Sequence, residues 1–386
     1  MLLKLPSFSI GMGWKELRRF ESLNETECSI VFYAENKASM NHFRLLISEL
    51  TEKMNLQICY VTSIKDDPIF LTKNQNIKSF YIGDGSARTK FFLTLKSKIM
   101  IMDMPDLNMF HIKRSMTFPV HYVYLFHSMF SIHSYLRKGA IDNYDTIFCV
   151  GEHHINEIRE TEKVYGLKPK KLIKYGYGRL DTLIHEKKNY SKNHSDIKNL
   201  ILITPSYGDE NLLKICGIEL IDILLKSNFK VLLRPHFRTL RDSKKLMNDI
   251  KERFEKNPNF ILETGVIPSN LFHNALGMIS DWSGISLEYA FTFERPVIFI
   301  DVPKKNVNLN VKDIMLDPIE ISIRNKIGHV VLPKNLEKIP SIFNNLEKNT
   351  ENFYEQIKKI SSKTVYNIGN SAKIGAKYIQ ELNDSP

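Results

Sequence analysis

The chain has 386 residues, of which 43% are hydrophobic and 25% charged, and it carries a formal net charge of +11. This length exceeds one ordinary core, and no apolar run reaches the ~18 residues of a membrane-spanning helix, so we expect two domains of a soluble protein. The positive charge suits an anionic partner, or follows from a composition rich in Lys, Asn and Ile; because the lysines are scattered without interleaved aromatic residues, nucleic acid is not an expected partner.

The cysteines and the N-terminal segment indicate a cytoplasmic protein. Four cysteines lie far apart without a CxxC pair, which is typical of reduced core residues rather than of zinc ligands or disulfides. Lys4 and Pro6 interrupt the first apolar residues, so residues 1–23 do not resemble a signal peptide.

The first half of the chain alternates short β-branched or aromatic runs with amphipathic segments. Strands are predicted at 29–35, 56–63, 79–83, 97–106, 119–128 and 146–151, and helices at 39–54 and 87–95. Strands that alternate with helices are typical of a parallel sheet covered on both faces.

The same alternation begins again after the polar, lysine-rich stretch 185–198. Strands are predicted at 199–206, 230–235, 259–264, 277–281 and 295–301, helices at 212–227, 240–255 and 285–292, and further helices toward the C-terminus on both sides of a break at 366–371. We therefore expect an α/β protein of two Rossmann-like domains that face each other across a cleft: residues 1–185, a linker at 186–198, and residues 199–386.

The stretch 281–284, Asp-Trp-Ser-Gly, lies where a predicted buried strand ends and a helix begins. Ligands of parallel sheets bind beyond the carboxyl ends of strands, and the free N–H groups of a helix N-terminus favour anions. Ser283 offers a hydroxyl, Gly284 permits close approach of a phosphate, and Glu288 could accept hydrogen bonds from a ribose. The alternative is that Asp281 or Ser283 only caps the helix.

Two further strand ends carry histidines. Arg234 and His236 leave the strand at 230–235 together, with Arg238 nearby, a grouping that favours phosphate binding. His127 follows the strand at 119–128, and histidine suits a general base near neutral pH. A satisfied structural histidine is the alternative in each case.

The stretch 174–183 has two glycines around a tyrosine, followed by Arg179 and Asp181, and predicts a tight turn. A structural turn with an Arg–Asp pair is the competing interpretation. The acidic pairs at 103/106 and 142/145 are weak signals for a metal, and the absence of GxxxxGK[ST] and HExxH argues against P-loop NTPases and zincins.

Taken together, these stretches resemble the CDP-glycerol glycerophosphotransferases that build teichoic acids and related polymers. The likeness extends over roughly residues 100–305. It rests on five matches, to a WHG-type histidine segment at 126–128, a GYPRxD turn at 176–181, a KPHP-type strand end at 234–237, a TDYSS-type turn at 280–284 and a KPVIF-type strand at 295–299. Here Gly178 and Phe237 replace prolines, and Gly284 replaces a serine.

The resemblance implies a GT-B arrangement and transfer of glycerol phosphate, or a similar polyol phosphate, from a CDP-activated donor to a glycan or lipid-linked acceptor, with release of CMP and without a metal or other cofactor. It implies catalytic roles for His127 and His236. Donor contacts are implied for a further set of residues, Arg179, Arg234, Asp281, Ser283, Gly284 and Glu288.

Two other functions remain open on the sequence: a GT-B glycosyltransferase that uses a nucleotide sugar for capsule or lipopolysaccharide synthesis, and a non-catalytic nucleotide- or glycan-binding protein. Leu2, Leu3, Lys4, Phe8, Trp14, Lys15, Arg18 and Arg19 combine apolar and basic side chains near the N-terminus. We expect this segment to give peripheral contact with acidic lipid at the inner face of the cell membrane.

Overall fold

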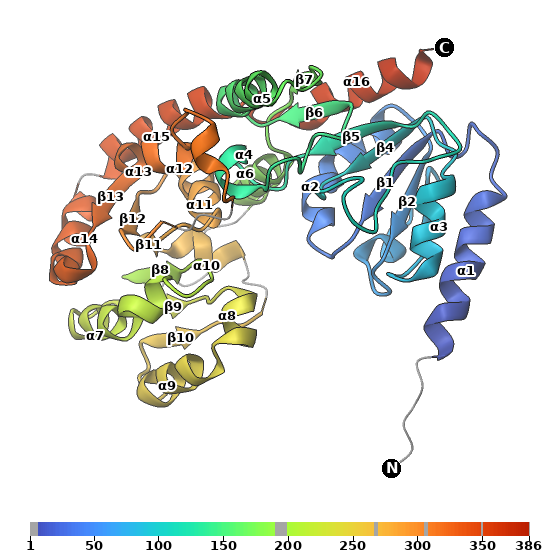
Figure 1. Ribbon diagram of the computed structural model, residues 1–386. Coiled ribbons are helices and arrows are strands. Elements are labelled where there is room, and N and C mark those ends of the chain that lie inside the picture. The colour runs from blue at the N-terminus through green and yellow to red at the C-terminus, as the bar shows by residue number, and fades with distance from the viewer. Residues whose placement is uncertain (1–6, 190–198, 266–268, 305–307, 349, 386) are drawn as a thin grey trace. The chain divides into compact units, whose positions relative to one another are not determined.

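The computed structural model describes residues 7–189, 199–265, 269–304, 308–348 and 350–385. The chain forms two compact units (Figure 1). Unit 1 comprises Met1–Asp181, Asn308–Ile314 and Val365–Pro386, and unit 2 comprises Thr182–Val307 and Met315–Thr364. The predicted α/β fold with two Rossmann-like halves is confirmed, because each unit is built on its own parallel sheet.

Unit 1 contains a seven-stranded parallel sheet in the order β3-β2-β1-β4-β5-β6-β7. Its strands are β1 (Ile30–Ala34), β2 (Ile58–Thr62), β3 (Ile77–Tyr81), β4 (Ile99–Met102), β5 (His121–Leu125), β6 (Thr146–Cys149) and β7 (Lys171–Lys174). The central strands β1 and β4 are buried along their whole length, as expected for apolar runs covered on both faces. The chain direction reverses across the sheet between β1 and β4, and such a switch point opens a crevice at the carboxyl ends of the strands.

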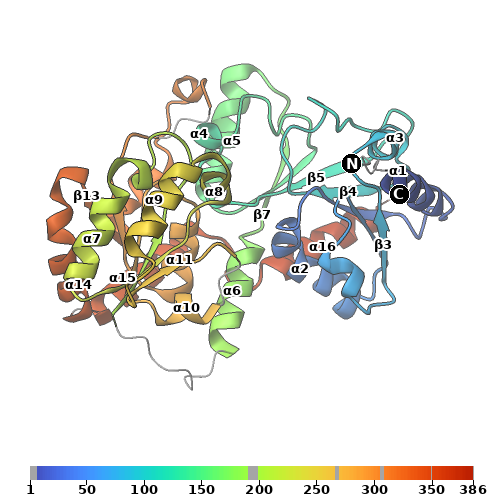
Figure 2. The same ribbon diagram turned by 90° about the horizontal axis from the view of Figure 1, so that it is seen from below.

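Helices cover both faces of this sheet (Figures 1 and 2). They are α1 (Ser7–Glu21), α2 (Ser39–Ser48) with a π-turn η1 (Glu49–Lys53), α3 (Ser86–Thr94), α4 (Ile132–Tyr135), α5 (Glu152–Tyr165), α6 (Gly178–Asn189) and α16 (Ser371–Asp384), with a 3-10 turn η2 (Pro68–Leu71). On the face that α2 and α16 share, Phe32 and Ile101 of the sheet pack with Phe43 and Leu46 of α2. Ile379 of α16 joins the same core.

Helix α16 therefore belongs to unit 1, although the sequence placed residues 199–386 in one domain. Its apolar face packs on α2 and β4. The approach is made at Gly176, which has φ +106°, and where a Cβ would overlap the carbonyl oxygen of Tyr366. Asp181 accepts hydrogen bonds from the backbone N–H groups of Gly369, at 2.7 Å, and Ser371, at 3.0 Å, and so stabilises the start of α16.

Unit 2 contains a six-stranded parallel sheet in the order β10-β9-β8-β11-β12-β13. Its strands are β8 (Leu200–Thr204), β9 (Lys230–Leu233), β10 (Phe260–Leu262), β11 (Gly277–Ser280), β12 (Val297–Ile300) and β13 (Gly328–Val331). The switch point of this sheet lies between β8 and β11.

The helical elements of unit 2 surround its sheet (Figure 2). They are η3 (Leu213–Gly217), α7 (Ile218–Lys226), α8 (Phe237–Asp242), α9 (Lys244–Phe254), α10 (Ser269–Asn274), α11 (Ile285–Phe293), α12 (Ile319–Ser322), α13 (Arg324–Ile327), η5 (Pro333–Lys338), α14 (Ile339–Lys348) and α15 (Thr350–Thr364). One core joins Ile203, Leu233 and Ile279 of the sheet to Leu220 of α7 and Phe343 of α14.

Some elements differ from the sequence-based expectation. The sequence prediction did not include α5, β7 or β13. The expected turn at 174–183 is largely the first half of α6, which continues to Asn189, so the start of the predicted linker is helical. The remainder of the linker, 190–198, lies outside the described residues.

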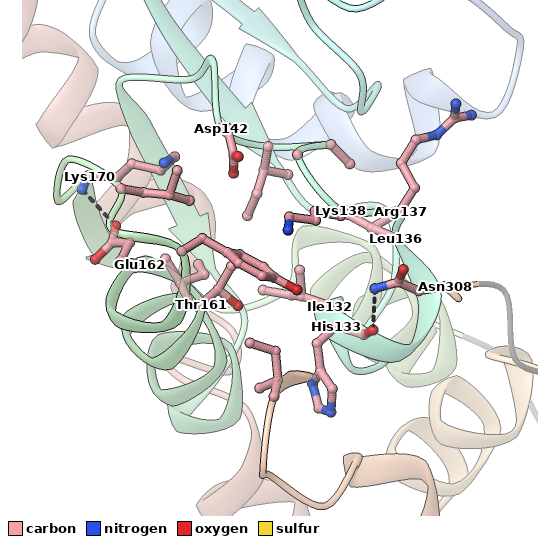
Figure 3. A pocket seen from close by; sticks show the side chains of 17 residues that line it. Ile132, His133, Leu136, Arg137, Lys138, Asp142, Thr161, Glu162, Lys170 and Asn308 are labelled. Atoms are coloured by element: carbon pink, nitrogen blue, oxygen red, sulfur yellow. Dashed lines mark hydrogen bonds between the residues drawn. The ribbon is translucent and has the colours of Figure 1, made fainter. Parts of the chain in front are cut away.

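The segment 308–314, with the 3-10 turn η4 (Val311–Asp313), is held on α4 and α5 within unit 1 (Figure 3). Asn308 donates to the carbonyl oxygen of His133 at 2.9 Å, and Tyr165 donates to Asp313 at 2.8 Å. Beneath this segment is a cavity of about 40 Å³, which has space for water but not for a nucleotide. No helix in the described part of the chain is long and apolar enough to cross a membrane.

Candidate active site

Three of the predicted donor-binding residues line one pocket in unit 2. The pocket has a volume of about 240 Å³ and lies at the carboxyl edge of the sheet, where Thr204 ends β8 and Glu263 follows β10. Arg234, directly after β9, His236 and Ser283 face it together. The strand-end rule therefore identified a set of side chains that the fold brings into one cavity.

His236 has a defined hydrogen-bonding state. It is the N-cap of α8, and its Nδ1 accepts a hydrogen bond from the backbone N–H of Arg238 at 3.1 Å. In the neutral ring the proton is then on Nε2, which makes Nε2 a donor. The ring also lies against Tyr207, with centroids 4.5 Å apart, and this contact fixes its orientation in the pocket wall.

Asp281 has a positioning role rather than the predicted direct contact with a donor. Its side chain is buried at the end of β11 and does not line the pocket. One carboxylate oxygen accepts from the backbone N–H of Ser206 at 2.6 Å, and the other accepts from Leu212 N–H and Ser206 Oγ, both at 3.0 Å. Burial raises the pKa of this carboxyl, and the hydrogen bonds oppose that shift. Asp281 thus fixes the loop after β8 that forms one side of the pocket.

Ser283 and Gly284 precede α11 in the way expected for an anion site. Gly284 is the N-cap, with φ −58°, and no side chain caps this helix, so neither Asp281 nor Ser283 has the capping role considered above. The Ser283 carbonyl oxygen accepts from the hydroxyl of Ser286 at 2.8 Å. Glu288 is half-buried in the first turn of α11 and is not among the residues that line the pocket; its contact with a ribose stays a prediction.

In unit 1, His127 lies two residues beyond β5 at the carboxyl edge of the sheet. Its Nδ1 is 2.9 Å from the backbone carbonyl oxygen of Asp103, which can only accept, so Nδ1 carries the proton. Nε2 is then left with its lone pair, and the side chain is exposed to solvent. Desolvation by the surrounding protein lowers the pKa of His127, so the imidazole is neutral at pH 7. These are the properties of a general base.

The surroundings of His127 include residues that the sequence did not single out. Asp103, directly after β4, is buried, accepts from the Ser39 hydroxyl at 2.9 Å, and has its pKa raised by burial to about 7. Tyr177 donates to the backbone oxygen of His127 at 3.0 Å. The ring of His42 on α2 is 6.3 Å from that of His127, and burial lowers the pKa of His42 to about 3.

Arg179 belongs to this second group. It lies in the first turn of α6, in unit 1, close enough for its charge to contribute to the lowered pKa of His42. It is not a lining residue of the unit 2 pocket, so its predicted contact with the donor stays a prediction. Its expected partner, Asp181, instead binds the start of α16.

Comparison with known proteins identifies the family. The model of the CDP-Glycerol:Poly(glycerophosphate) glycerophosphotransferase family matches residues 17–373. No curated protein matches the chain in sequence.

Solved structures show the same fold. The chain is similar to the wall teichoic acid polymerase TagF, solved as a His-to-Asn variant soaked with CDPG, at 12% identity and a TM-score of 0.59, with 97% of this chain and 94% of that chain covered. It is also similar to UDP-GlcNAc 2-epimerases from Neisseria meningitidis, at 15% identity and a TM-score of 0.59, with 91% of this chain and 99% of that chain covered, and from Methanocaldococcus jannaschii, at 16% and 0.60, with 92% and 99% covered. The fold is therefore GT-B-like, and since the family model spans most of the sequence, the chain belongs to the CDP-glycerol:poly(glycerophosphate) glycerophosphotransferase family of enzymes.

Proposed function

We propose that this enzyme transfers glycerol phosphate, or a similar polyol phosphate, from a CDP-activated donor to a hydroxyl of a cell-surface glycan or of a teichoic-acid-like or capsular polymer. The observation that carries the proposal is the state of His127, a neutral imidazole with Nδ1–H held by a backbone carbonyl and Nε2 open to a proton. The family match and the likeness to a polymerase soaked with CDPG support CDP-glycerol as the donor.

In the proposed reaction the acceptor hydroxyl oxygen attacks the β-phosphorus of the donor. A new P–O bond forms to the acceptor, the bond from the β-phosphorus to the bridging oxygen breaks, and CMP leaves with the electron pair. The acceptor proton passes to Nε2 of His127. Phosphoryl transfer depends mainly on positioning and on stabilisation of charge, which the donor pocket is suited to supply.

The residues of the unit 2 pocket have complementary roles in this proposal. Arg234 supplies a guanidinium and His236 supplies Nε2–H to the pyrophosphate. Ser283 adds a hydroxyl beside the free N–H groups at the start of α11. Glu288 would hold the ribose. Within the described residues no group of three or more His, Cys, Asp or Glu side chains is arranged to hold a metal.

The test is to incubate the protein with CDP-glycerol and a panel of glycan and polyol phosphate acceptors, and to identify the released nucleotide. Acceptor-dependent CMP supports phosphotransfer. Release of a nucleoside diphosphate from a sugar nucleotide, with no CMP from CDP-glycerol, would instead assign the enzyme to glycosyl transfer. Tight donor binding without turnover would contradict both.

We further propose weak attachment of the N-terminal helix to acidic lipid. On α1, Trp14 donates to Ser86 at 3.2 Å and Arg19 pairs with Glu16 at 2.6 Å, so Lys15 and Arg18, both exposed, are the residues that would meet a membrane. Leu2, Leu3 and Lys4 lie outside the described residues. Equal flotation with neutral and with anionic liposomes at low salt would contradict this.

A further inference from the structure

A second pocket lies in unit 1, at the switch point of the seven-stranded sheet. It has a volume of about 310 Å³, and its walls include Glu35, directly after β1, and the residues Met104 to Asp106, shortly after β4. The backbone of Asp103, the neighbour of Met104, holds the imidazole of His127. The pocket is therefore adjacent in the fold to the proposed base, which is where an acceptor has to bind.

Its charged side chains occur as matched pairs. Arg88 lies 3.3 Å from Glu35, and the Nε of Arg137 lies 3.2 Å from Asp106. The pocket thus has two guanidinium groups and two carboxylates, and its formal charge is balanced. Arg88 is 12% exposed, and its buried Nε has no hydrogen-bond partner among the described residues, which leaves a donor for a ligand or water.

This arrangement distinguishes between the two acceptor chemistries considered above. A phosphodiester chain presents only acceptors, so it is served by donors and is repelled by carboxylates. A sugar hydroxyl both donates and accepts, so it is served by a carboxylate and a guanidinium placed side by side. Paired acids and arginines therefore favour a neutral, polyhydroxylated ligand over a polyanion.

Phe110 supplies the apolar part of such a site. Its side chain lines the pocket and is 53% exposed, an unusual position for a large apolar ring unless it contacts a ligand. The guanidinium of Arg137 lies over the ring, 4.7 Å from its centroid, and fixes its orientation. The exposed remainder of the ring is suited to pack against the C–H face of a sugar.

We infer that this pocket binds a neutral saccharide of the acceptor, so that the hydroxyl that receives the polyol phosphate belongs to a glycan and not to a poly(glycerol phosphate) chain. The inference rests on the proposed function, because it takes His127 as the base. Glu35 and Asp106 accept from sugar hydroxyls, Arg88 and Arg137 donate to them, and Phe110 packs on the ring.

The test is direct binding, measured without turnover. The protein is applied to an array of neutral oligosaccharides that covers the common hexoses, N-acetylhexosamines and deoxyhexoses, and separately to oligomers of glycerol phosphate. We expect binding to at least one neutral saccharide and at least tenfold weaker binding by Phe110→Ala. Met116→Ala is the matched control, because Met116 is 81% exposed and does not line the pocket; it should bind as the wild type does.

Two results would overturn the inference: no neutral saccharide on the array is bound, or glycerol phosphate oligomers bind more tightly and Phe110→Ala weakens them. The affinity for CDP-glycerol, measured on the same preparations, separates this failure from failure of the proposed function. A protein that binds CDP-glycerol but no saccharide refutes only the acceptor assignment.

Discussion

Replacing Asp103 with asparagine should remove a pH-dependent weakness of unit 1. Burial raises the pKa of this carboxyl from 3.8 to about 7 in the folded protein. Below pH ~4 the group is protonated in both states; as the pH rises toward 7 the unfolded chain ionises while the folded protein keeps its proton, so stability falls. A shift of about 3 units corresponds to roughly 4 kcal/mol of lost stability above pH 7. Asparagine keeps an acceptor for the Ser39 hydroxyl and does not ionise.

The assay is hydrogen exchange by mass spectrometry at pH 5 and pH 8, corrected for the intrinsic exchange rate and followed on peptides from β1 and β4. The wild type should lose protection at pH 8 relative to pH 5, and Asp103→Asn should keep more of it. Asp66→Asn, at an exposed aspartate paired with Lys37 in the same unit, is the control and should leave the pH dependence of β4 unchanged. An identical pH dependence in wild type and Asp103→Asn would refute the reasoning.

Three other substitutions test the remaining roles. His127→Ala should lower kcat by ~10²–10⁴ and abolish the acidic limb of the pH–rate profile, which would lie below the usual range of histidine because burial lowers this pKa; loss of CDP-glycerol affinity in proportion to rate would contradict the assignment as base. His236→Ala and Ser283→Ala should each weaken CDP-glycerol binding by about 1.5–3 kcal/mol in calorimetry, and unchanged affinity in both would remove the donor site from this pocket. Gly176→Ala should destabilise unit 1 by at least about 2 kcal/mol in urea unfolding, because the new methyl would overlap the Tyr366 carbonyl oxygen at a positive φ; unchanged stability would mean that the contact relaxes freely.

The parts of the fold that the sequence predicted are those with a strong local pattern. The β1 and β4 runs are apolar throughout, and their burial follows directly. Strand β7, Lys-Leu-Ile-Lys, has exposed lysines at both ends and lies at the sheet edge, so it has no such run. Helix α5 was missed because its first turn reads Glu-His-His-Ile and its apolar residues are sparse. The placement of α16 depends on contacts across the whole sequence, which no local pattern records.

The candidate site shows the same limit. Arg234, His236 and Ser283 could be predicted because each follows a recognisable strand, and the carboxyl ends of parallel strands share one edge. The contacts of Asp103 with Ser39 and His127 could not, since they require β1, β4 and β5 to be neighbours, and the order of strands in a sheet is not written in any one of them. In sequence, Asp103 was only one half of a weak acidic pair.

The return of α16 to unit 1 has a consequence for a chain that is being synthesised. The face of the first sheet that receives Ala376 and Ile379 is complete only when the last residues have been added. Roughly 200 residues separate Asp181, where the first stretch of unit 1 ends, from the end of the sequence, which at typical elongation rates corresponds to about 10–40 s. During this interval unit 2 can be completed while the nascent first sheet still presents an uncovered apolar surface, a substrate for the chaperones that meet emerging polypeptides.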